Sequence, residues 1–331
     1  IENIRASAHE PQPLTASSVR LALRAATLNY RDLLMVTGKY NPKQPLPFIP
    51  LSDGVGEVLE EGSDVDRLSV GDRVCPLFSP GWIAGPIREN TVAHSLGGPI
   101  DGVLREQMVV QEEDAVRIPE HLSEAQAAAL PCAALTAWSA LFTHNTLSPG
   151  DSVLLLGTGG VSIAALQFAK AAGARVYITS SSDRKLERAR ALGADQTLNY
   201  RDEPNWGKAI RKLTGGRGVE HVVEVGGAGT LAQSLRAVRR GGTVSLLGVL
   251  AGSGDPQLVS AVMNMVRIQG IFVGHRTSFE AMNRAIAHHR IEPVVDSIFP
   301  ATDVVGAFNT FQDQKHFGKI AIAIDDAKTS K

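Results

Sequence analysis

The sequence predicts an α/β protein in which a doubly wound parallel sheet of six strands is inserted into a β-rich domain. Two observations predict the sheet: the apolar run 153–156 leads into a glycine-rich turn, and short apolar runs then alternate with helix-like segments up to residue 273. Such alternation is typical of parallel strands covered by helices. A third observation concerns the flanking segments, 1–133 and 275–331, which contain short alternating runs and many turn signals and are expected to form one β-rich domain.

The glycine turn has the spacing of a dinucleotide-binding fingerprint. Gly157 allows a tight turn, Gly159 lets the backbone approach a pyrophosphate, and the next helix offers unpaired N–H groups at its N-terminus. Ser162 replaces the usual third glycine, and serine is small enough for close helix packing. Because a lone fingerprint is weak evidence, the surrounding strand array is what predicts a Rossmann nucleotide-binding domain over 134–274.

The other elements are expected in a regular order along the chain. In the nucleotide domain, strands are expected at 175–179, 196–199, 219–225, 243–247 and 268–273, with helices at 161–172, 183–192, 204–215 and 230–240. The β-rich domain is expected to hold strands near 19–25, 55–59, 73–77, 103–110, 294–298 and 319–324, with helices near 279–289 and 302–311.

Composition and charge fit a soluble enzyme acting on a small molecule. The 331 residues are 44% apolar, which is enough for two cores, and the formal net charge of −1 gives no reason to expect nucleic acid or a membrane as partner. The stretch 125–142 is apolar but broken by polar residues, so it is expected to be a buried helical connection. Two distant cysteines and the lack of a basic-then-apolar leader pattern predict a cytoplasmic location.

Several segments together resemble the medium-chain dehydrogenase/reductase superfamily, in particular its zinc-independent alcohol dehydrogenase-like and quinone oxidoreductase-like branches. The matching segments extend over nearly the whole chain: LNYRD at 28–32, DGVGEV at 53–58, GDRV at 71–74, LPCAALTAW at 130–138, the glycine turn, and FGK at 317–319. The resemblance implies a GroES-like catalytic domain, a Rossmann domain, and a homodimer or homotetramer joined through the Rossmann sheets.

The departures from zinc-dependent members of this superfamily predict a metal-free site. The resemblance places the three zinc ligands of those members at Asn29, Ser52 and Cys132. Neutral amide and hydroxyl oxygens are poor zinc ligands, so only one of the three positions keeps a suitable donor. The clustered cysteines of a structural zinc lobe are also absent, and no histidine stands at metal-ligand spacing from a cysteine. We therefore expect no zinc.

Without a metal, the oxyanion that develops during hydride transfer needs hydrogen-bond donors. The amide of Asn29 and the phenol of Tyr30 are the leading catalytic candidates, because the resemblance places them beside the nicotinamide. Alternatively, Asn29 bridges backbone groups and Tyr30 packs with its hydroxyl satisfied locally. Arg31 and Asp32 could equally be a structural pair.

Three further residues are expected to line the substrate pocket. Tyr40 and Trp82 could supply an aromatic wall, although each could instead belong to the core. Cys132 is expected to line the site as a small buried side chain and not as a reactive thiol.

The residues expected to contact the cofactor lie mainly at the carboxyl ends of the parallel strands. They are Thr136, Gly157, Gly159, Gly160, Val161, Ser180, Ser182, Arg184, Lys185, Tyr200, Gly226, Gly248, Val249, Val273, Gly274 and Lys319. The resemblance adds Thr136 and Tyr200 to this set. The glycines could equally be ordinary turn residues, and Thr136 could bond back to its own helix.

The end of the second strand favours NADP(H) over NAD(H). An NAD enzyme usually places an acidic residue there to bind the ribose hydroxyls, but in alignment with the family this position falls on Ser180. Serines can donate to a 2′-phosphate, and Arg184 or Lys185 can neutralise it unless they form only a solvated helix face. Asp183 is the counter-evidence, although its place ahead of a helix predicts an N-cap.

Three functions remain open from the sequence. The first is a zinc-independent NADPH-dependent oxidoreductase that transfers hydride to or from a small carbonyl, alcohol, enone or quinone. The second is an enoyl reductase that reduces a carbon–carbon double bond, because LNYRD also resembles the enoyl reductase modules of polyketide and fatty-acid synthases. The third is an NADP(H)-binding protein with little turnover.

Overall fold

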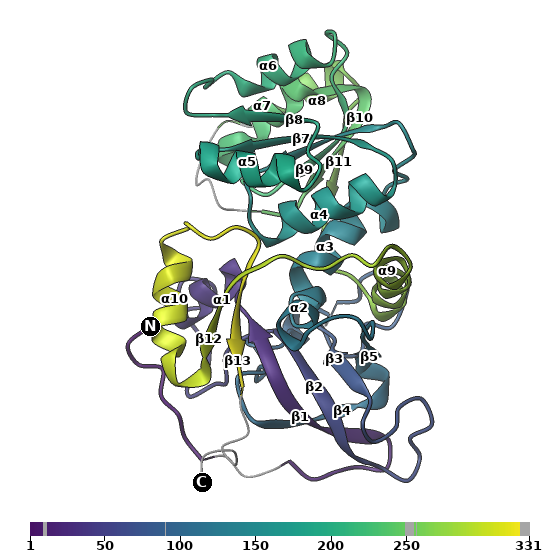
Figure 1. Cartoon of the computed structure of the whole chain (residues 1–331), viewed down its shortest axis with the longest axis vertical. Helices are drawn as coiled ribbons and strands as arrows, with labels where there is room; N and C mark the ends of the chain where they lie inside the picture. The colour runs from purple at the N-terminus through teal and green to yellow at the C-terminus, as the bar shows by residue number, and fades with distance from the viewer. Residues whose placement is uncertain (9–11, 90, 249–254, 256, 325–331) are drawn as a thin grey trace. The chain divides into compact units, whose positions relative to one another are not determined.

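The computed structural model describes residues 1–8, 12–89, 91–248, 255 and 257–324 (Figure 1). The chain divides into two compact units. We call Ile1–Leu135 together with Gly274–Lys331 the β-rich unit, and Thr136–Val273 the Rossmann unit. The chain therefore leaves the β-rich unit once, builds the Rossmann unit, and returns.

The β-rich unit is built on a seven-stranded sheet. Its strands run in the order β12-β13-β1-β2-β3-β5, and β4 pairs with β1. Their bounds are β1 Ser18–Thr27, β2 Asp53–Glu61, β3 Arg73–Pro76, β4 Gln107–Gln111, β5 Ala115–Arg117, β12 Val295–Pro300 and β13 Lys319–Ala323. Helix α10 (Val304–Gln312) covers part of this sheet, where Phe308 packs with Ile320 and Ile322 in the core.

Strands β1 and β13 join two distant parts of the sequence. They pair antiparallel with Thr27 opposite Ala321, and the Leu28 N–H donates to the Ile320 carbonyl over 3.0 Å. Continuing this register by two residues brings Asn29 opposite Lys319. The pairing thus fixes two candidate site residues against each other.

Five further helical elements belong to the β-rich unit. They are α1 (Tyr30–Val36), η1 (Val92–His94), η2 (Glu112–Asp114), α9 (Arg276–His289) and η5 (Ala301–Asp303). The strand expected at 103–110 is wrong in its first half, since β4 begins at Gln107. The Val103 N–H instead bonds to the Leu51 carbonyl over 2.9 Å, so its burial comes from loop packing and not from strand pairing.

A continuous helical run spans Glu124–Thr143. It consists of α2 (Glu124–Ala127), η3 (Leu130–Ala134), α3 (Leu135–Trp138) and η4 (Ser139–Thr143). By length and composition alone this run could cross a membrane, but 78% of its most apolar window is buried inside the protein. Such burial is typical of a core helix.

The Rossmann unit contains a six-stranded sheet in the order β11-β10-β9-β6-β7-β8, and every pair in it is parallel. The strands are β6 Ser152–Leu156, β7 Arg175–Ser180, β8 Gln196–Asn199, β9 Val219–Glu224, β10 Val238–Leu246 and β11 Arg267–Gly270. The helices are α4 Gly160–Ala171, α5 Asp183–Ala191, α6 Trp206–Leu213, α7 Ala228–Ala237 and α8 Val259–Met263. The predicted fold class, a doubly wound sheet inserted into a β-rich domain, is confirmed.

Both faces of the central strand are covered. All five residues of β6 are buried, which requires helices on both sides of the sheet. Helix α4 packs on β6 and β7, whereas Trp206 of α6 and Leu235 of α7 join Leu154 and Val222 in a single core cluster. The apolar runs of the sequence are therefore central parallel strands.

Candidate functional site

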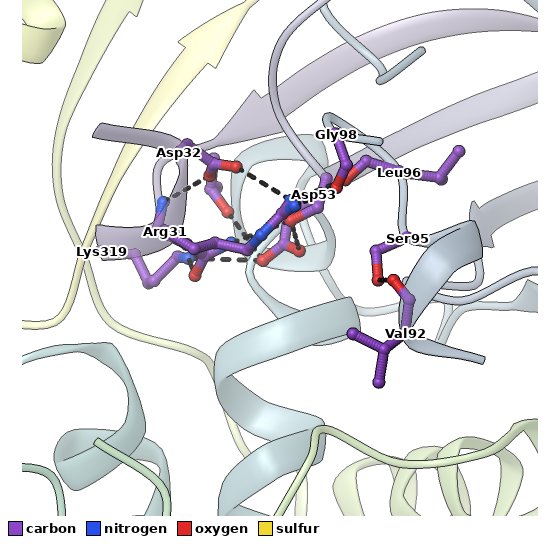
Figure 2. A network of polar contacts seen from close by, with 11 residues as sticks. Arg31, Asp32, Asp53, Val92, Ser95, Leu96, Gly98 and Lys319 are labelled. Carbon is purple, nitrogen blue, oxygen red and sulfur yellow. Dashed lines mark hydrogen bonds and ion pairs between the residues drawn. The ribbon is translucent and has the colours of Figure 1, made fainter. Parts of the chain in front are cut away.

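A buried polar cluster lies where β1 ends and β13 begins. We call it the Asn29–Lys319 cluster and define it by Asn29, Arg31, Asp32, Ser52, Asp53 and Lys319. Figure 2 labels Arg31, Asp32, Asp53 and Lys319. Five of the six residues are at most 9% exposed to solvent, and the sixth, Arg31, is half-buried. Polar groups removed from water to this extent must satisfy one another.

The start of helix α1 positions Asn29. Asn29 is the N-cap residue, and Asp32, three residues later, accepts a hydrogen bond from the Asn29 backbone N–H over 2.8 Å. This is half of a capping box, in which an acidic third residue reaches back to the cap. The backbone of Asn29 is thereby held while its amide group bonds to other side chains.

Lys319 sets the orientation of the Asn29 amide. The Lys319 ammonium donates to Asn29 Oδ1 over 2.6 Å, and the opposite side of the amide, Nδ2, donates to Ser52 Oγ over 3.3 Å. An ammonium group cannot accept a hydrogen bond, so the carbonyl oxygen of the amide must face it. The N–H side of Asn29 is then fixed as the donor side.

Asp53 closes the ring of contacts. Its Oδ1 accepts from Ser52 Oγ over 3.0 Å, and its Oδ2 lies 3.4 Å from the Lys319 ammonium. The side chains of this ion pair are 0% and 6% exposed, so neither charge has much access to water. Removing one partner of such a pair leaves an uncompensated buried charge.

Arg31 ties the cluster to a neighbouring loop. Its guanidinium donates to the carbonyls of Leu96, over 2.6 Å, and Gly98, as Figure 2 shows. The same group lies over the rings of Tyr40 and Phe78, at 5.5 and 5.1 Å from their centroids. The distance from Arg31 Nη1 to Asp32 Oδ1 is 3.5 Å, longer than its bond to the Leu96 carbonyl. Arg31 therefore serves mainly to hold the loop.

Burial shifts two titrating groups here. Burial raises the pKa of Asp32 to about 6; Arg31 opposes the rise and Asp53 adds to it. Burial, followed by the charge of Asp53, also raises the pKa of the Cys132 thiol well above its usual value. Cys132 is therefore a protonated thiol near these carboxylates and lacks the depressed pKa of a reactive cysteine.

The other residues expected in the substrate site have different environments. Tyr30 is half-buried and packs against the core of the β-rich unit, and no described residue hydrogen-bonds its hydroxyl. Tyr40 is 47% exposed, with its ring beneath Arg31. Trp82 is buried, its indole N–H donates to the Gly85 carbonyl over 3.1 Å, and its ring meets His275 edge-on.

The residues at the zinc-ligand positions form a poor donor set. Asn29 Oδ1 already accepts from an ammonium group, Ser52 offers only a hydroxyl, and the Cys132 thiol has a raised pKa. Among the residues that the structure describes, no group of three His, Cys, Asp or Glu side chains could hold a metal ion.

The glycine turn after β6 leaves space for a ligand. Gly157 has a φ of +70°, a conformation that favours glycine, and Gly159 is the N-cap of α4. A Cβ atom added to either would meet no other heavy atom within 4 Å. Ser162, at the position of the usual third glycine, has a structural role: its hydroxyl donates to the Leu156 carbonyl over 2.7 Å. Gly160 and Val161 form the first residues of the helix.

The end of β7 carries the residues expected to select the cofactor. Ser180 is buried, and its Oγ accepts from the Ser182 N–H over 3.3 Å. The prediction that Asp183 is an N-cap is wrong: Ser182 is the cap, and Asp183, the first helical residue, accepts from the Asn199 side chain over 3.0 Å. Arg184 is exposed and Lys185 half-buried, while Tyr200 follows β8 and is 42% exposed.

Glu224, at the end of β9, was not expected from the sequence. Its fully buried carboxylate accepts from the N–H groups of Gly226 and Gly227, over 2.7 and 3.0 Å, and from the hydroxyls of Thr230 and Ser234. It therefore shapes the glycine turn at this strand end. The signal in the sequence was an acidic residue at the end of an otherwise apolar strand.

The remaining cofactor candidates are placed as follows. Gly248 approaches Val225 so closely that an added Cβ would lie 1.6 Å from its carbonyl oxygen, and at Gly226 an added Cβ would lie 2.3 Å from Thr230 Oγ1. These glycines are required by packing within the protein. Thr136 and Val273 are buried in the Rossmann unit, Gly274 begins the return to the β-rich unit, and Val249 lies outside the described residues.

Comparison with known proteins assigns both units to one family. Residues 15–120 match the alcohol dehydrogenase GroES-like domain, and residues 160–288 match the zinc-binding dehydrogenase family. A zinc-type alcohol dehydrogenase-like protein from Schizosaccharomyces pombe is 42% identical over 322 residues, which cover 95% of this chain and 93% of that protein.

Solved structures agree with this assignment. A crystal structure from Sinorhizobium meliloti 1021, provisionally described as an alcohol dehydrogenase, is 40% identical with a TM-score of 0.87, covering 95% of this chain and 92% of that one. The structure of an NAD-dependent alcohol dehydrogenase is 32% identical with a TM-score of 0.86, covering 96% and 95% of the two chains. The chain therefore belongs to the medium-chain dehydrogenase/reductase superfamily of oxidoreductases, which typically use a nicotinamide cofactor.

Proposed function

We propose that the protein is a zinc-independent, NADPH-dependent oxidoreductase that transfers hydride to or from a small carbonyl, alcohol, enone or quinone. The observation that carries this proposal is the fixed amide of Asn29, whose oxygen faces Lys319 and whose N–H side is left as a donor. One Nδ2 hydrogen is directed at Ser52, so the second can be given to a substrate oxygen. The adjacent ammonium group adds a positive potential where negative charge develops.

The donor set supports the metal-free part of the proposal. A zinc ion bound by Asn29 Oδ1 would have to displace the Lys319 ammonium and would lie beside its positive charge. Because an amide, a hydroxyl and a protonated thiol do not fit the ligand preferences of zinc, we assign no chemical step to a metal. Metal analysis of the purified protein, and activity after chelation, test this point directly.

The cofactor preference rests on the end of β7. Ser180 replaces an acidic residue there, and one oxygen of the neighbouring Asp183 is occupied by Asn199. The NAD-dependent relative at 32% identity is the main argument for the opposite preference. We expect Arg184→Ala with Lys185→Ala to weaken NADPH binding at least tenfold and NADH binding less than threefold, as measured by nicotinamide fluorescence. Equal weakening of NADPH and NADH binding would contradict the proposal that Arg184 and Lys185 bind the 2′-phosphate.

The decisive experiment is a cofactor-oxidation screen against aldehydes, enals and quinones, run with Asn29→Ala and Tyr30→Phe beside the natural chain. Loss of one preorganised donor typically costs 10²–10³-fold in rate, so we expect about this loss in kcat for Asn29→Ala and less than tenfold for Tyr30→Phe. NADPH binding without turnover across the whole panel would overturn the enzymatic proposal. A larger loss for Tyr30→Phe would transfer the donor role to Tyr30.

We also propose that the chain forms a homodimer or homotetramer through its Rossmann unit. Strand β11 is an edge strand, and exposed apolar side chains lie on and beside α8: Leu258, Val259, Val262, Met263 and Met265 are each at least 53% exposed. An apolar patch next to a free strand edge is typical of an interface. Light scattering should show a monomer for Val259→Glu with Met263→Glu.

A further inference from the structure

A basic hollow of about 1000 Å³ opens on the Rossmann unit. Its walls come from helix α6, the turn before β9, the end of α7, the start of β10 and helix α8, and all of these except α8 supply cations. Among the eleven described residues that line it, six are cationic: Lys208, Arg211, Arg217, Arg236, Arg239 and Arg240. This concentration is unusual in a chain whose formal net charge is −1.

One of the six cations has a purely structural task. The Arg211 guanidinium donates to the carbonyls of Arg236, over 2.8 Å, and Val238, over 2.6 Å, at the end of α7. These bonds satisfy carbonyls that the helix end leaves unpaired. Arg211 therefore builds the wall and is not needed to explain binding.

Two of the remaining cations, Arg217 and Arg239, are paired with one carboxylate, that of Glu220. Glu220 lies 3.2 Å from Arg217 and 3.4 Å from Arg239, and it also accepts from the backbone and hydroxyl of Ser152. Although burial opposes its ionisation, the bonds from Ser152 and the charge of Arg217 lower the pKa of Glu220. Its one negative charge is thus shared between two arginines.

The other three cations lack an acidic partner in the described part of the chain. Arg236 donates to Gln257 over 3.1 Å and Arg240 to Asn264 over 3.3 Å, and both acceptors are neutral amides. Lys208 is exposed and forms no ion pair with any described residue. Cations held together without counter-charges repel one another, and this repulsion is relieved when an anion binds.

The hollow lies at the end of the sheet where the parallel strands begin, whereas the glycine turn lies at the end where they stop. Arg217 precedes β9 and Arg240 lies near the start of β10, whereas the glycine turns follow the carboxyl ends of the strands. Val238 at the start of β10 pairs with Val219, and Leu246 at its end pairs with Glu224, so the two ends of β10 are five residue steps of β9 apart, about 17 Å in a strand. Arg240 lies in the irregular stretch of β10 between Val238 and Thr243. The basic hollow is therefore separate from the expected cofactor site.

We propose that the basic hollow binds a compact polyanion, a small molecule with several phosphate groups. The concave shape and the convergence of cations from four segments fit a compact ligand better than an extended one. Single-stranded nucleic acid is favoured less, because the described residues that line the hollow include no aromatic side chain to stack a base. Ser260 and Asn264 in the wall can add neutral hydrogen bonds to phosphate oxygens.

The test uses inorganic tripolyphosphate as the probe and calorimetry as the measurement. The first variant combines Lys208→Glu, Arg236→Glu and Arg240→Glu. The matched control combines Arg190→Glu, Lys212→Glu and Arg284→Glu, which changes the net charge equally at exposed positions outside the hollow. NADPH affinity within twofold of the natural chain verifies that each variant is folded.

We expect the hollow variant to weaken tripolyphosphate binding at least tenfold and the control variant to weaken it less than threefold. The same loss in both variants, or no binding by the natural chain, would overturn the proposal. A labelled single-stranded RNA tests the other class of ligand. Binding of RNA that depends on the hollow, with no binding of tripolyphosphate, would also overturn the proposal in favour of an extended polymer.

Discussion

The Asn29–Lys319 cluster and the basic hollow both gather ionisable side chains, but they balance charge differently. In the cluster, the acids Asp32 and Asp53 face the bases Arg31 and Lys319, and the acids and Lys319 are almost completely buried. In the described part of the hollow, Glu220 lies beside only two of the six bases, Arg217 and Arg239, and several of the six reach solvent. Internal balance holds groups in one orientation, whereas imbalance leaves a surface ready for an external charge.

The largest change in stability is expected when one charge is removed from the Asn29–Lys319 cluster. Lys319→Met leaves the buried Asp53 carboxylate without its cation, so we expect the free energy of unfolding in urea to fall by about 3–5 kcal/mol. Lys319→Met combined with Asp53→Asn removes both charges and should recover most of this loss. A double variant as unstable as the single one would show that packing, and not charge balance, is responsible.

A second test uses the titration of Asp32. Its pKa of about 6 in the folded chain exceeds the usual 3.8, so the folded state holds this proton more tightly than the unfolded state does. The resulting stability is fully present below about pH 4 and is lost as the pH rises through 6. Relative to Asp32→Asn, the free energy of unfolding of the natural chain should therefore fall by about 2 kcal/mol between pH 4 and 7. A difference that does not change with pH would contradict the raised pKa.

The smallest effect is expected in the unbalanced hollow. Arg240→Gln removes one repelling cation at the surface, so the stability should change by at most about 0.5 kcal/mol. The change should be a gain in low salt that disappears in about 0.5 M salt, where surface charges are screened. Lys212→Gln, outside the hollow, is the control and should show no such salt dependence in thermal unfolding.

The fold could be predicted from the sequence because its signals are local. Strands β6 and β9 of the Rossmann unit are apolar runs followed within two residues by glycine, and the alternation of strand-like and helix-like segments along the chain predicts a parallel sheet. The strand expected from residue 103 was wrong in part because Val103 is apolar for a different reason, namely packing beneath a loop.

The sites were predicted less completely because they depend on distant contacts. Asn29 was expected as a donor, but its partner Lys319 is 290 residues away, and only the register of β1 and β13 brings them together. Nothing in the sequence around Lys208, Arg236 or Arg240 distinguishes these residues from ordinary solvent-exposed cations. Their convergence in one hollow follows from tertiary packing, which no local pattern encodes.

The pairing of β1 with β13 also has a consequence for synthesis of the chain. A ribosome makes β1, Asn29 and Asp53 early, but it supplies Lys319 only after the whole Rossmann unit has been translated. Until then β1 lacks its β13 neighbour, and Asp53 lacks its cation. A polypeptide released before this point would contain the Rossmann unit, but its Asn29 amide would lack the ammonium group that orients it.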